Sequence, residues 1–84
     1  MNELMNAIID AHDEAVRARA KWSTLNSAHE GYGVLAEEFR DLERHVFAKQ
    51  GDRDLAAMRT EAIQIAATAL RIAAEVCNEQ VGRR

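Results

Sequence analysis

The sequence predicts an all-α fold, a small helical bundle of three helices in a single domain over residues 1–84. Proline is absent and glycine occurs only four times, so little interrupts a helical hydrogen-bond ladder. Apolar residues recur at steps of three and four, which is typical of amphipathic helices. The turn signals that a β-sandwich or barrel needs about every 8–12 residues are missing.

The first helix is expected over residues 2–25. Asn2 is a suitable N-cap, because its side chain can accept a hydrogen bond from a free backbone N–H of the first turn. One apolar stripe follows at helical spacing, made of Leu4, Ile8, Ala11, Ala15, Ala18 and Trp22.

The second helix is expected over residues 28–50. Ser27 and Glu30 have the spacing of a capping box, and Gly51 is suited to a left-handed residue after the helix end. Gly31 and Gly33 lie in the first turns. They indicate either a frayed start or the close approach of a neighbouring helix or ligand. The apolar stripe of this helix consists of Tyr32, Leu35, Phe39, Leu42 and Val46.

The third helix is expected over residues 52–81, with Asp52 as N-cap and Gly82 as terminator. It is apolar nearly all round, apart from one polar seam of Glu61, Gln64, Thr68, Arg71 and Glu75. Two partner helices can hardly cover such a helix. We therefore expect a homo-oligomer, a dimer or tetramer, with an interface at or near Ile65, Ala69, Ile72 and Val76.

Composition narrows the classes of partner. The net charge is −3 and the sequence contains no basic stripe, so we expect no nucleic-acid partner. We expect no membrane partner, because no stretch approaches the roughly 20 apolar residues that span a bilayer. The single cysteine, Cys77, cannot form an internal disulfide and favours a reducing cytoplasm. A glycine-rich phosphate loop and paired zinc ligands are both absent from the sequence.

Two helices carry oxygen-bearing side chains three residues apart. Glu38 and Asp41 form one pair and Glu61 and Gln64 the other, so each pair can point at a common position. Antiparallel packing of the two helices would bring the carboxylates together. Their mutual repulsion would then raise the pKa of a carboxyl group, unless a hard cation such as Mg²⁺ bound between them. The alternative is a set of ordinary surface charges, paired with Arg40, Arg44 and Arg59.

The segments HEGYGVLAEEFRDLERHV and MRTEAIQIAATALRIAAEV resemble the MazG-like members of the all-α nucleoside triphosphate pyrophosphohydrolase superfamily, particularly short phage-type versions. That superfamily carries E-x-x-E and E-x-x-D on two helices and binds Mg²⁺. The resemblance implies Mg²⁺-dependent hydrolysis (Mn²⁺ is an alternative ion) of a ribo- or deoxyribonucleoside triphosphate to a monophosphate and pyrophosphate. It implies Glu38 and Glu61 as catalytic residues, and as metal ligands Glu38, Asp41, Glu61 and Gln64.

The chain departs from the superfamily pattern at two positions. Asp41 stands in place of glutamate, and Gln64 in place of aspartate, which removes one negative charge from the site. A neutral amide binds a cation less strongly than a carboxylate does. The alternative is therefore a non-catalytic helical oligomer of the same fold that binds nucleotide or a protein partner.

Lys21 and Trp22 resemble a lysine–tryptophan pair that related proteins place near the nucleotide. Trp22 could stack on a base and Lys21 could neutralise a phosphate, or Trp22 could anchor the bundle. His29 and His45 are possible ligands or phosphate contacts, or ordinary residues of helix flanks.

Overall fold

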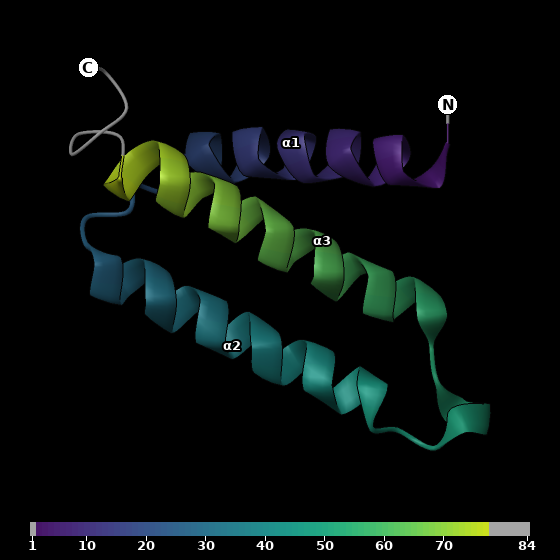
Figure 1. Ribbon diagram of the computed structural model, residues 1–84. Coiled ribbons are helices and arrows are strands. Elements are labelled where there is room, and N and C mark those ends of the chain that lie inside the picture. Colours follow the sequence, from purple (N-terminus) through teal and green to yellow (C-terminus); the bar gives the residue numbers. More distant parts are fainter. Residues whose placement is uncertain (1, 78–84) are drawn as a thin grey trace.

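The computed structural model describes residues 2–77, and every regular element within this range is helical (Figure 1). The three long helices are α1 (Glu3–Lys21), α2 (Ala28–Val46) and α3 (Leu55–Arg71). A 3₁₀ turn, η1 (Gln50–Asp52), precedes α3, and a π-helical turn, η2 (Ile72–Val76), extends it. The prediction of three helices is confirmed. The expected residues 78–81 of the third helix and its terminator Gly82 lie outside the described residues.

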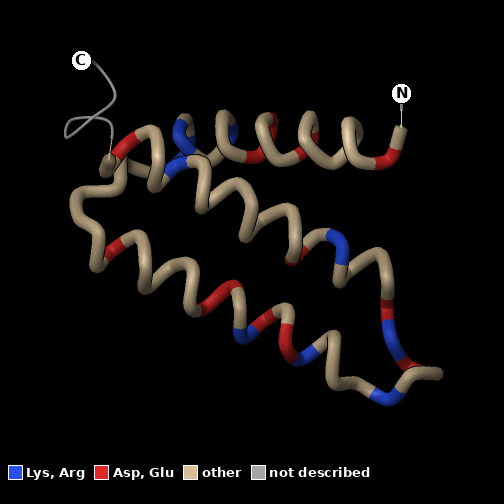
Figure 2. Tube along the Cα trace, viewed as in Figure 1, with Lys and Arg blue, Asp and Glu red and all other residues tan. Residues whose placement is uncertain are grey.

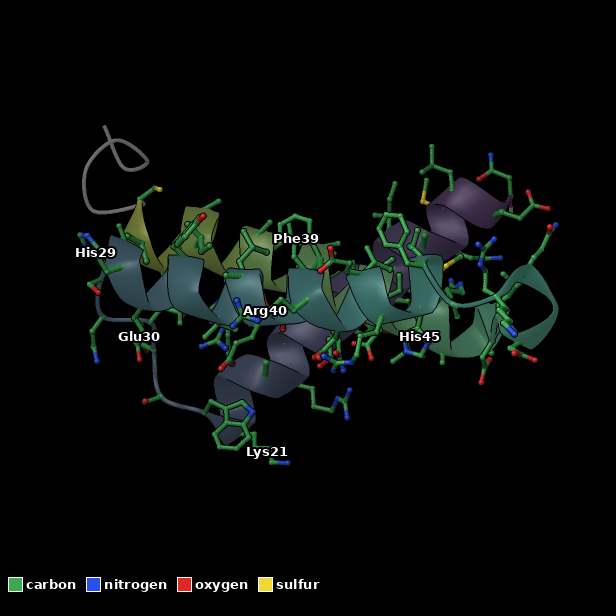
Figure 3. The ribbon with its side chains drawn as sticks, turned by 90° about the horizontal axis from the view of Figure 1, so that it is seen from below. Lys21, His29, Glu30, Phe39, Arg40 and His45 are labelled. Atoms are coloured by element: carbon green, nitrogen blue, oxygen red, sulfur yellow. The ribbon has the colours of Figure 1, made fainter. Side chains whose placement is uncertain are left out.

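The three helices form an open layer with α3 in the middle. Within residues 2–77, α3 contacts both α1 and α2, whereas α1 and α2 do not come within 8 Å of each other, Cα to Cα. Figure 1 shows α2 running antiparallel to α3 and α1 running in the same general direction as α3, and Figure 3 shows that α1 crosses the other two helices obliquely. The layer therefore has two broad faces. The carboxylate-bearing helices α2 and α3 are neighbours, as the sequence predicts.

The helix starts follow the expected capping chemistry at two of three positions. The Asn2 side chain accepts a hydrogen bond from the Met5 N–H, and the Ser27 hydroxyl accepts one from Glu30. The Glu30 carboxylate completes a variant of the capping box by accepting from the Asn26 N–H at 2.6 Å.

The prediction that Asp52 caps the third helix is wrong. Asp52 lies in η1, and Asp54 provides the cap instead, because its Oδ1 accepts from the Ala57 N–H at 3.0 Å. The second helix correspondingly ends at Val46 rather than near residue 50. There the Arg53 guanidinium donates to the free Val46 carbonyl at 2.8 Å. Gly51 does not have the left-handed backbone that we expected.

The first helix also ends earlier than predicted, at Lys21 rather than residue 25. The reason is tertiary. Arg71 donates to the Ser23 carbonyl, and the Leu25 N–H donates to Glu75, so α3 and η2 bind backbone groups that a longer α1 would use itself. The Leu25 side chain is buried in the same region.

The burial pattern of α3 is the reverse of a simple amphipathic helix. Thr68 and Arg71 of the polar seam are buried, whereas the apolar residues Leu70 and Ala69 are exposed. In the described part of the chain no large side chain is fully buried. The buried apolar residues are Ala11, Ala15, Leu25 and Ala67.

Gly31 lets α2 approach the end of α3 closely. A Cβ at this position would lie 2.8 Å from Ile72 Cγ1, and Gly31 is buried. Ile72, which we expected near a subunit interface, is therefore engaged within the chain. A Cβ at Gly33 would meet nothing within 4 Å, so close approach explains only the first glycine. Among the described residues, no helix has the length and apolar character needed to cross a membrane.

These two glycines provide a matched test of the helix contact. We expect Gly31→Ala to destabilise the fold by about 1–3 kcal/mol, since Ile72 must move. Gly33→Ala should stabilise it by about 0.5–1 kcal/mol, because alanine is the better helix former in open space. Urea denaturation followed by circular dichroism measures both. Equal stabilisation by the two substitutions would contradict the close contact.

Candidate functional site

A polar pocket of about 220 Å³ opens on one face of the layer. It contains three residues that the sequence singled out, Trp22, Glu38 and Gln64, one from the end of α1 and one each from α2 and α3. The remaining lining residues are Glu14, Ala18, Val34, Ala67, Thr68 and Arg71. The pocket therefore joins all three helices.

Glu38 is the electrostatically unusual residue of this pocket. Its Oε1 is buried and has no hydrogen-bond partner among residues 2–77. Burial is the main cause that raises the pKa of the Glu38 carboxyl, and the negative charges of Asp41 and Glu61 raise it further. The Thr68 hydroxyl and the Arg71 charge partly offset this rise. The pKa of Glu38 is thus raised in the predicted direction, although burial and not repulsion between carboxylates is the main cause.

Asp41 and Glu61 act on Glu38 through their charge but do not line the pocket. Each has a basic neighbour. Asp41 pairs with Arg44 one turn along α2, and Glu61 Oε2 lies 3.7 Å from His45 Nε2 across the helix contact. Asp41 therefore forms a surface ion pair with an arginine, which is the alternative that the sequence offered. Glu61 instead interacts with His45 of the neighbouring helix.

The oxygen ligands present fit a hard divalent cation in their chemistry. A buried Glu38 oxygen without a hydrogen-bond partner, in a carboxylate that Asp41 and Glu61 repel, is what such an ion would stabilise. Their arrangement is not a preformed site: within residues 2–77 no three His, Cys, Asp or Glu side chains are close enough together to hold a metal. Gln64 lines the pocket beside Glu38 and offers a neutral oxygen.

Trp22 lines the pocket, and Lys21 precedes it at the end of α1. Trp22 is 62% exposed, so it does not anchor the core of this chain. The Lys21 Nζ lies 5.1 Å from the centre of the Trp22 ring, a cation–π distance. Figure 3 shows Lys21 and His45 projecting to the same side of the layer, while His29 is at the opposite end of α2 from His45. His29 is exposed and distant from the carboxylates.

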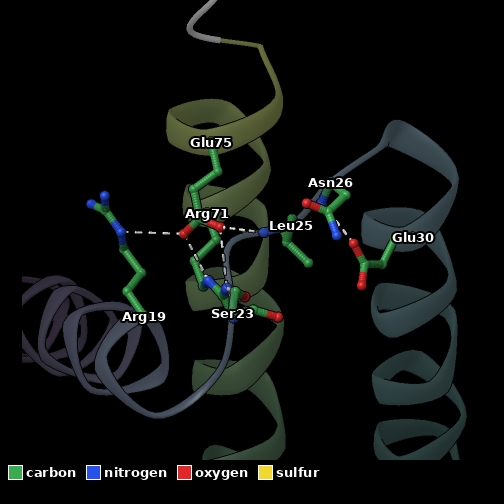
Figure 4. A network of polar contacts seen from close by, with 7 residues as sticks. All are labelled: Arg19, Ser23, Leu25, Asn26, Glu30, Arg71 and Glu75. Carbon is green, nitrogen blue, oxygen red and sulfur yellow. Dashed lines mark hydrogen bonds and ion pairs between the residues drawn. The ribbon is translucent and has the colours of Figure 1, made fainter.

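A buried ion network holds the end of this pocket together (Figure 4). Arg71 Nε donates to Glu75 Oε2 at 2.9 Å, and Arg71 Nη2 donates to Glu75 Oε1 at 3.1 Å and to the Ser23 carbonyl at 3.0 Å. The Leu25 N–H donates to Glu75 Oε1 at 2.8 Å, and Arg19 Nε lies 3.3 Å from Oε2. The Glu75 side chain is only 2% exposed.

These partners lower the pKa of Glu75. The hydrogen bond from Arg71 is the largest cause, burial opposes it, and the Leu25 N–H and the charges of Arg71 and Arg19 add to the lowering. Glu75 is therefore held as a carboxylate, and its charge stabilises the folded state at neutral pH.

Sequence reasoning did not assign Glu14, Thr68 and Arg71 to the pocket. The polar seam of α3 contained the signal for two of them, because Thr68 and Arg71 follow Gln64 on the same face at steps of four and three. Glu14 lies two turns before Trp22 on the face that also holds Ala18. The sequence alone does not show that these faces of α1 and α3 line the same pocket.

Comparison of the chain with protein-family models, with curated proteins and with solved structures found no match. The resemblance to MazG-like proteins therefore rests on the two short sequence motifs alone.

The ion network makes a pH-dependent prediction. Because the pKa of Glu75 is lowered, its stabilising contribution is complete above its ordinary value near 4.5 and is lost as the pH falls through the folded-state value. We expect Glu75→Gln to lower the free energy of unfolding by about 3 kcal/mol at pH 7, because Arg71 remains buried without its counter-ion. The difference from the wild type should shrink toward pH 3.

Guanidinium denaturation at pH 7, 5 and 3 measures this effect. Glu37→Gln is the control, because Glu37 is exposed on α2 and should change stability by less than about 0.5 kcal/mol at each pH. A constant difference between Glu75→Gln and the wild type from pH 7 to 3 would argue against an ionised, paired Glu75.

Proposed function

We propose that this protein is a Mg²⁺-dependent nucleoside triphosphate pyrophosphohydrolase of the MazG-like type, acting in a reducing cytoplasm. The observation that carries the proposal is Glu38. A half-buried carboxyl with an unpartnered oxygen, repelled by Asp41 and Glu61, costs folding stability. Such a cost is typical of functional sites, where a charged ligand relieves it.

The pocket supports a division of roles among the residues. Glu38, Asp41, Glu61 and the amide oxygen of Gln64 would hold the ion, which when bound supplies positive charge to a triphosphate. Glu38 and Glu61 would orient the attacking water, and the raised pKa of Glu38 suits this carboxylate to accept a proton from it. Trp22 would stack on the base, and Lys21 beside it would neutralise phosphate charge.

A second candidate function is nucleotide binding without hydrolysis. Gln64 favours it, because the pocket has a neutral amide where the superfamily has a carboxylate. The pairing of Asp41 with Arg44 favours it as well, since that carboxylate is already partly neutralised. Both candidates use the same pocket and differ only in turnover.

We expect Mg²⁺ to raise the melting temperature of the wild type, because it binds the folded state. At ten times its Kd the gain is about 1.4 kcal/mol, or roughly 6–11 °C for a chain of this size. Glu38→Gln should behave in the opposite way: it should melt higher than the wild type without Mg²⁺, since it removes a desolvated and repelled charge, and should gain nothing when the ion is added. Differential scanning calorimetry with and without Mg²⁺ or Mn²⁺ measures both effects.

Two further variants complete this experiment. Glu37→Gln, on the exposed side of α2, should keep the full gain. Gln64→Asp should increase the gain and raise or create pyrophosphate release from a panel of nucleoside triphosphates. If neither the wild type nor Gln64→Asp responds to millimolar Mg²⁺ or Mn²⁺, the carboxylates are ordinary charges and the enzymatic proposal is wrong.

Trp22 fluorescence separates binding from turnover. On addition of a nucleoside triphosphate with Mg²⁺, stacking should change the emission, because Trp22 is exposed in the free chain. Trp22→Ala should lose nucleotide binding while retaining its helical circular dichroism. A fluorescence response together with no pyrophosphate release would favour the non-catalytic alternative. No response at saturating nucleotide would contradict both candidates.

A further inference from the structure

Two charged residues of the pocket, Glu14 and Arg71, have no role in the proposed hydrolysis. Among the lining residues the ion is assigned to Glu38 and Gln64, and the Thr68 hydroxyl donates to Glu38. Glu14 and Arg71 therefore remain as the charged groups that the pocket offers to another part of a ligand. They lie on different helices, α1 and α3, and carry opposite charges.

Arg71 is buried and held in place by its partners. Its side chain is only 10% exposed, and it donates through Nε and Nη2 to Glu75 and to the Ser23 carbonyl. None of its hydrogen bonds within residues 2–77 uses Nη1. Because Glu75 already neutralises the guanidinium, the N–H groups of Nη1 are better suited to a neutral carbonyl oxygen than to a phosphate.

Arg71 also lies at the end of the pocket where a base would stack. The Ser23 carbonyl that it binds directly follows Trp22 in the chain. Figure 2 shows that the stretch of α3 between Glu61 and Arg71 carries no charged residue. The helix rises about 15 Å between these two positions, so the carboxylates that would hold the ion and Arg71 would contact different ends of a nucleotide.

Glu14 provides an acceptor on the α1 wall of the pocket. Its side chain is 22% exposed, Arg17 donates to Oε1, and no hydrogen bond within residues 2–77 uses Oε2. Glu14, Ala18 and Trp22 follow one another at steps of four, and all three line the pocket. Ala18 with Val34 and Ala67 gives the lining its apolar surface, which suits the faces of a flat aromatic ring.

We propose that Arg71 and Glu14 read the edge of the base and select bases that carry a carbonyl next to a ring N–H. Guanine, hypoxanthine and uracil have this edge. Arg71 Nη1 donates to the carbonyl oxygen, and Glu14 Oε2 accepts from the N–H. The inference rests on the proposed function, because the phosphates must point toward Glu61 and the ion for the base to reach Arg71.

Adenine and cytosine present the reverse order of groups, an amino group beside an unprotonated ring nitrogen. With the phosphates held at the ion, such a base would place its amino group against the Arg71 donors and its bare nitrogen against the Glu14 carboxylate. Both protein groups would then lose their partners in a partly buried site. The pocket therefore discriminates by mismatch as well as by attraction.

Isothermal titration calorimetry of the wild type with α,β-imido nucleoside triphosphates and millimolar Mg²⁺ tests this inference. The imido bridge prevents pyrophosphate release, so binding is measured whether or not the protein hydrolyses nucleotides. The inosine compound should bind about tenfold or more tighter than the adenosine compound, and uridine about tenfold or more tighter than cytidine, because each pair differs only at this edge. The 6-thio analogue of inosine should bind less tightly than inosine, since sulfur is a weak acceptor for Arg71.

Glu14→Gln tests the second contact. An amide donates as well as accepts, so the preference for inosine over adenosine should fall to less than about threefold. Asp13→Asn is the matched control: it removes the same single charge from the preceding residue of α1, but Asp13 is 71% exposed and does not line the pocket. This variant should keep the preference of the wild type.

Several outcomes would overturn the inference and leave the proposed function standing. They are equal binding within each pair, tighter binding of adenosine and cytidine, a preference that survives Glu14→Gln, and a preference that Asp13→Asn removes as well. Equal binding of inosine and its 6-thio analogue would contradict the contact with Arg71. If none of the nucleotides binds, the inference and the proposed function are both wrong.

Discussion

The Arg71–Glu75 pair is the interaction on which the arrangement of the three helices depends. It is nearly inaccessible to solvent, and it binds the backbone of the α1–α2 connection at Ser23 and Leu25. Because α1 and α2 do not contact each other, their relative position is set through this connection and through α3. Trp22 directly precedes Ser23, and Arg71 itself lines the pocket, so the network that ends α1 also places one wall of the site. A buried pair of this kind adds little net stability over an apolar core, but it fixes which backbone segment packs where.

The polar seam of α3 lies between α1 and α2 on one side of the molecule. The two faces of the molecule therefore differ in chemistry. One face gathers Glu14, Glu38, Gln64 and Trp22 around a pocket. The other exposes alanine, leucine and aromatic side chains. A single helix, α3, therefore provides both polar lining residues of the site and part of an exposed apolar surface. The buried core of residues 2–77 is correspondingly small and consists mostly of alanine.

Glu38 shows how the proposed site conflicts with stability. Its carboxyl is half buried, lacks a partner for one oxygen and is repelled from two directions. Glu75, in η2 at the end of α3, is also a buried carboxylate, but it accepts three hydrogen bonds, lies 3.3 Å from Arg19 and has a lowered pKa. The contrast separates a carboxylate that holds the fold together from one that the fold leaves available for a ligand.

The sequence by itself determined the three helices, their N-terminal caps at Asn2 and Ser27, and the presence of one pair of oxygen-bearing side chains on α2 and one on α3, because each depends on local spacing along one helix. Only the tertiary structure decided where α1 and α2 end, since Arg71, Glu75 and Arg53 bind their terminal backbone groups from positions distant in the chain. It also decided that Gly31 is a contact and Gly33 is not, and that the α3 seam joins Glu14 and Trp22 in one pocket. Periodicity shows which residues share a face of a helix, but the direction in which that face points depends on packing against the other helices.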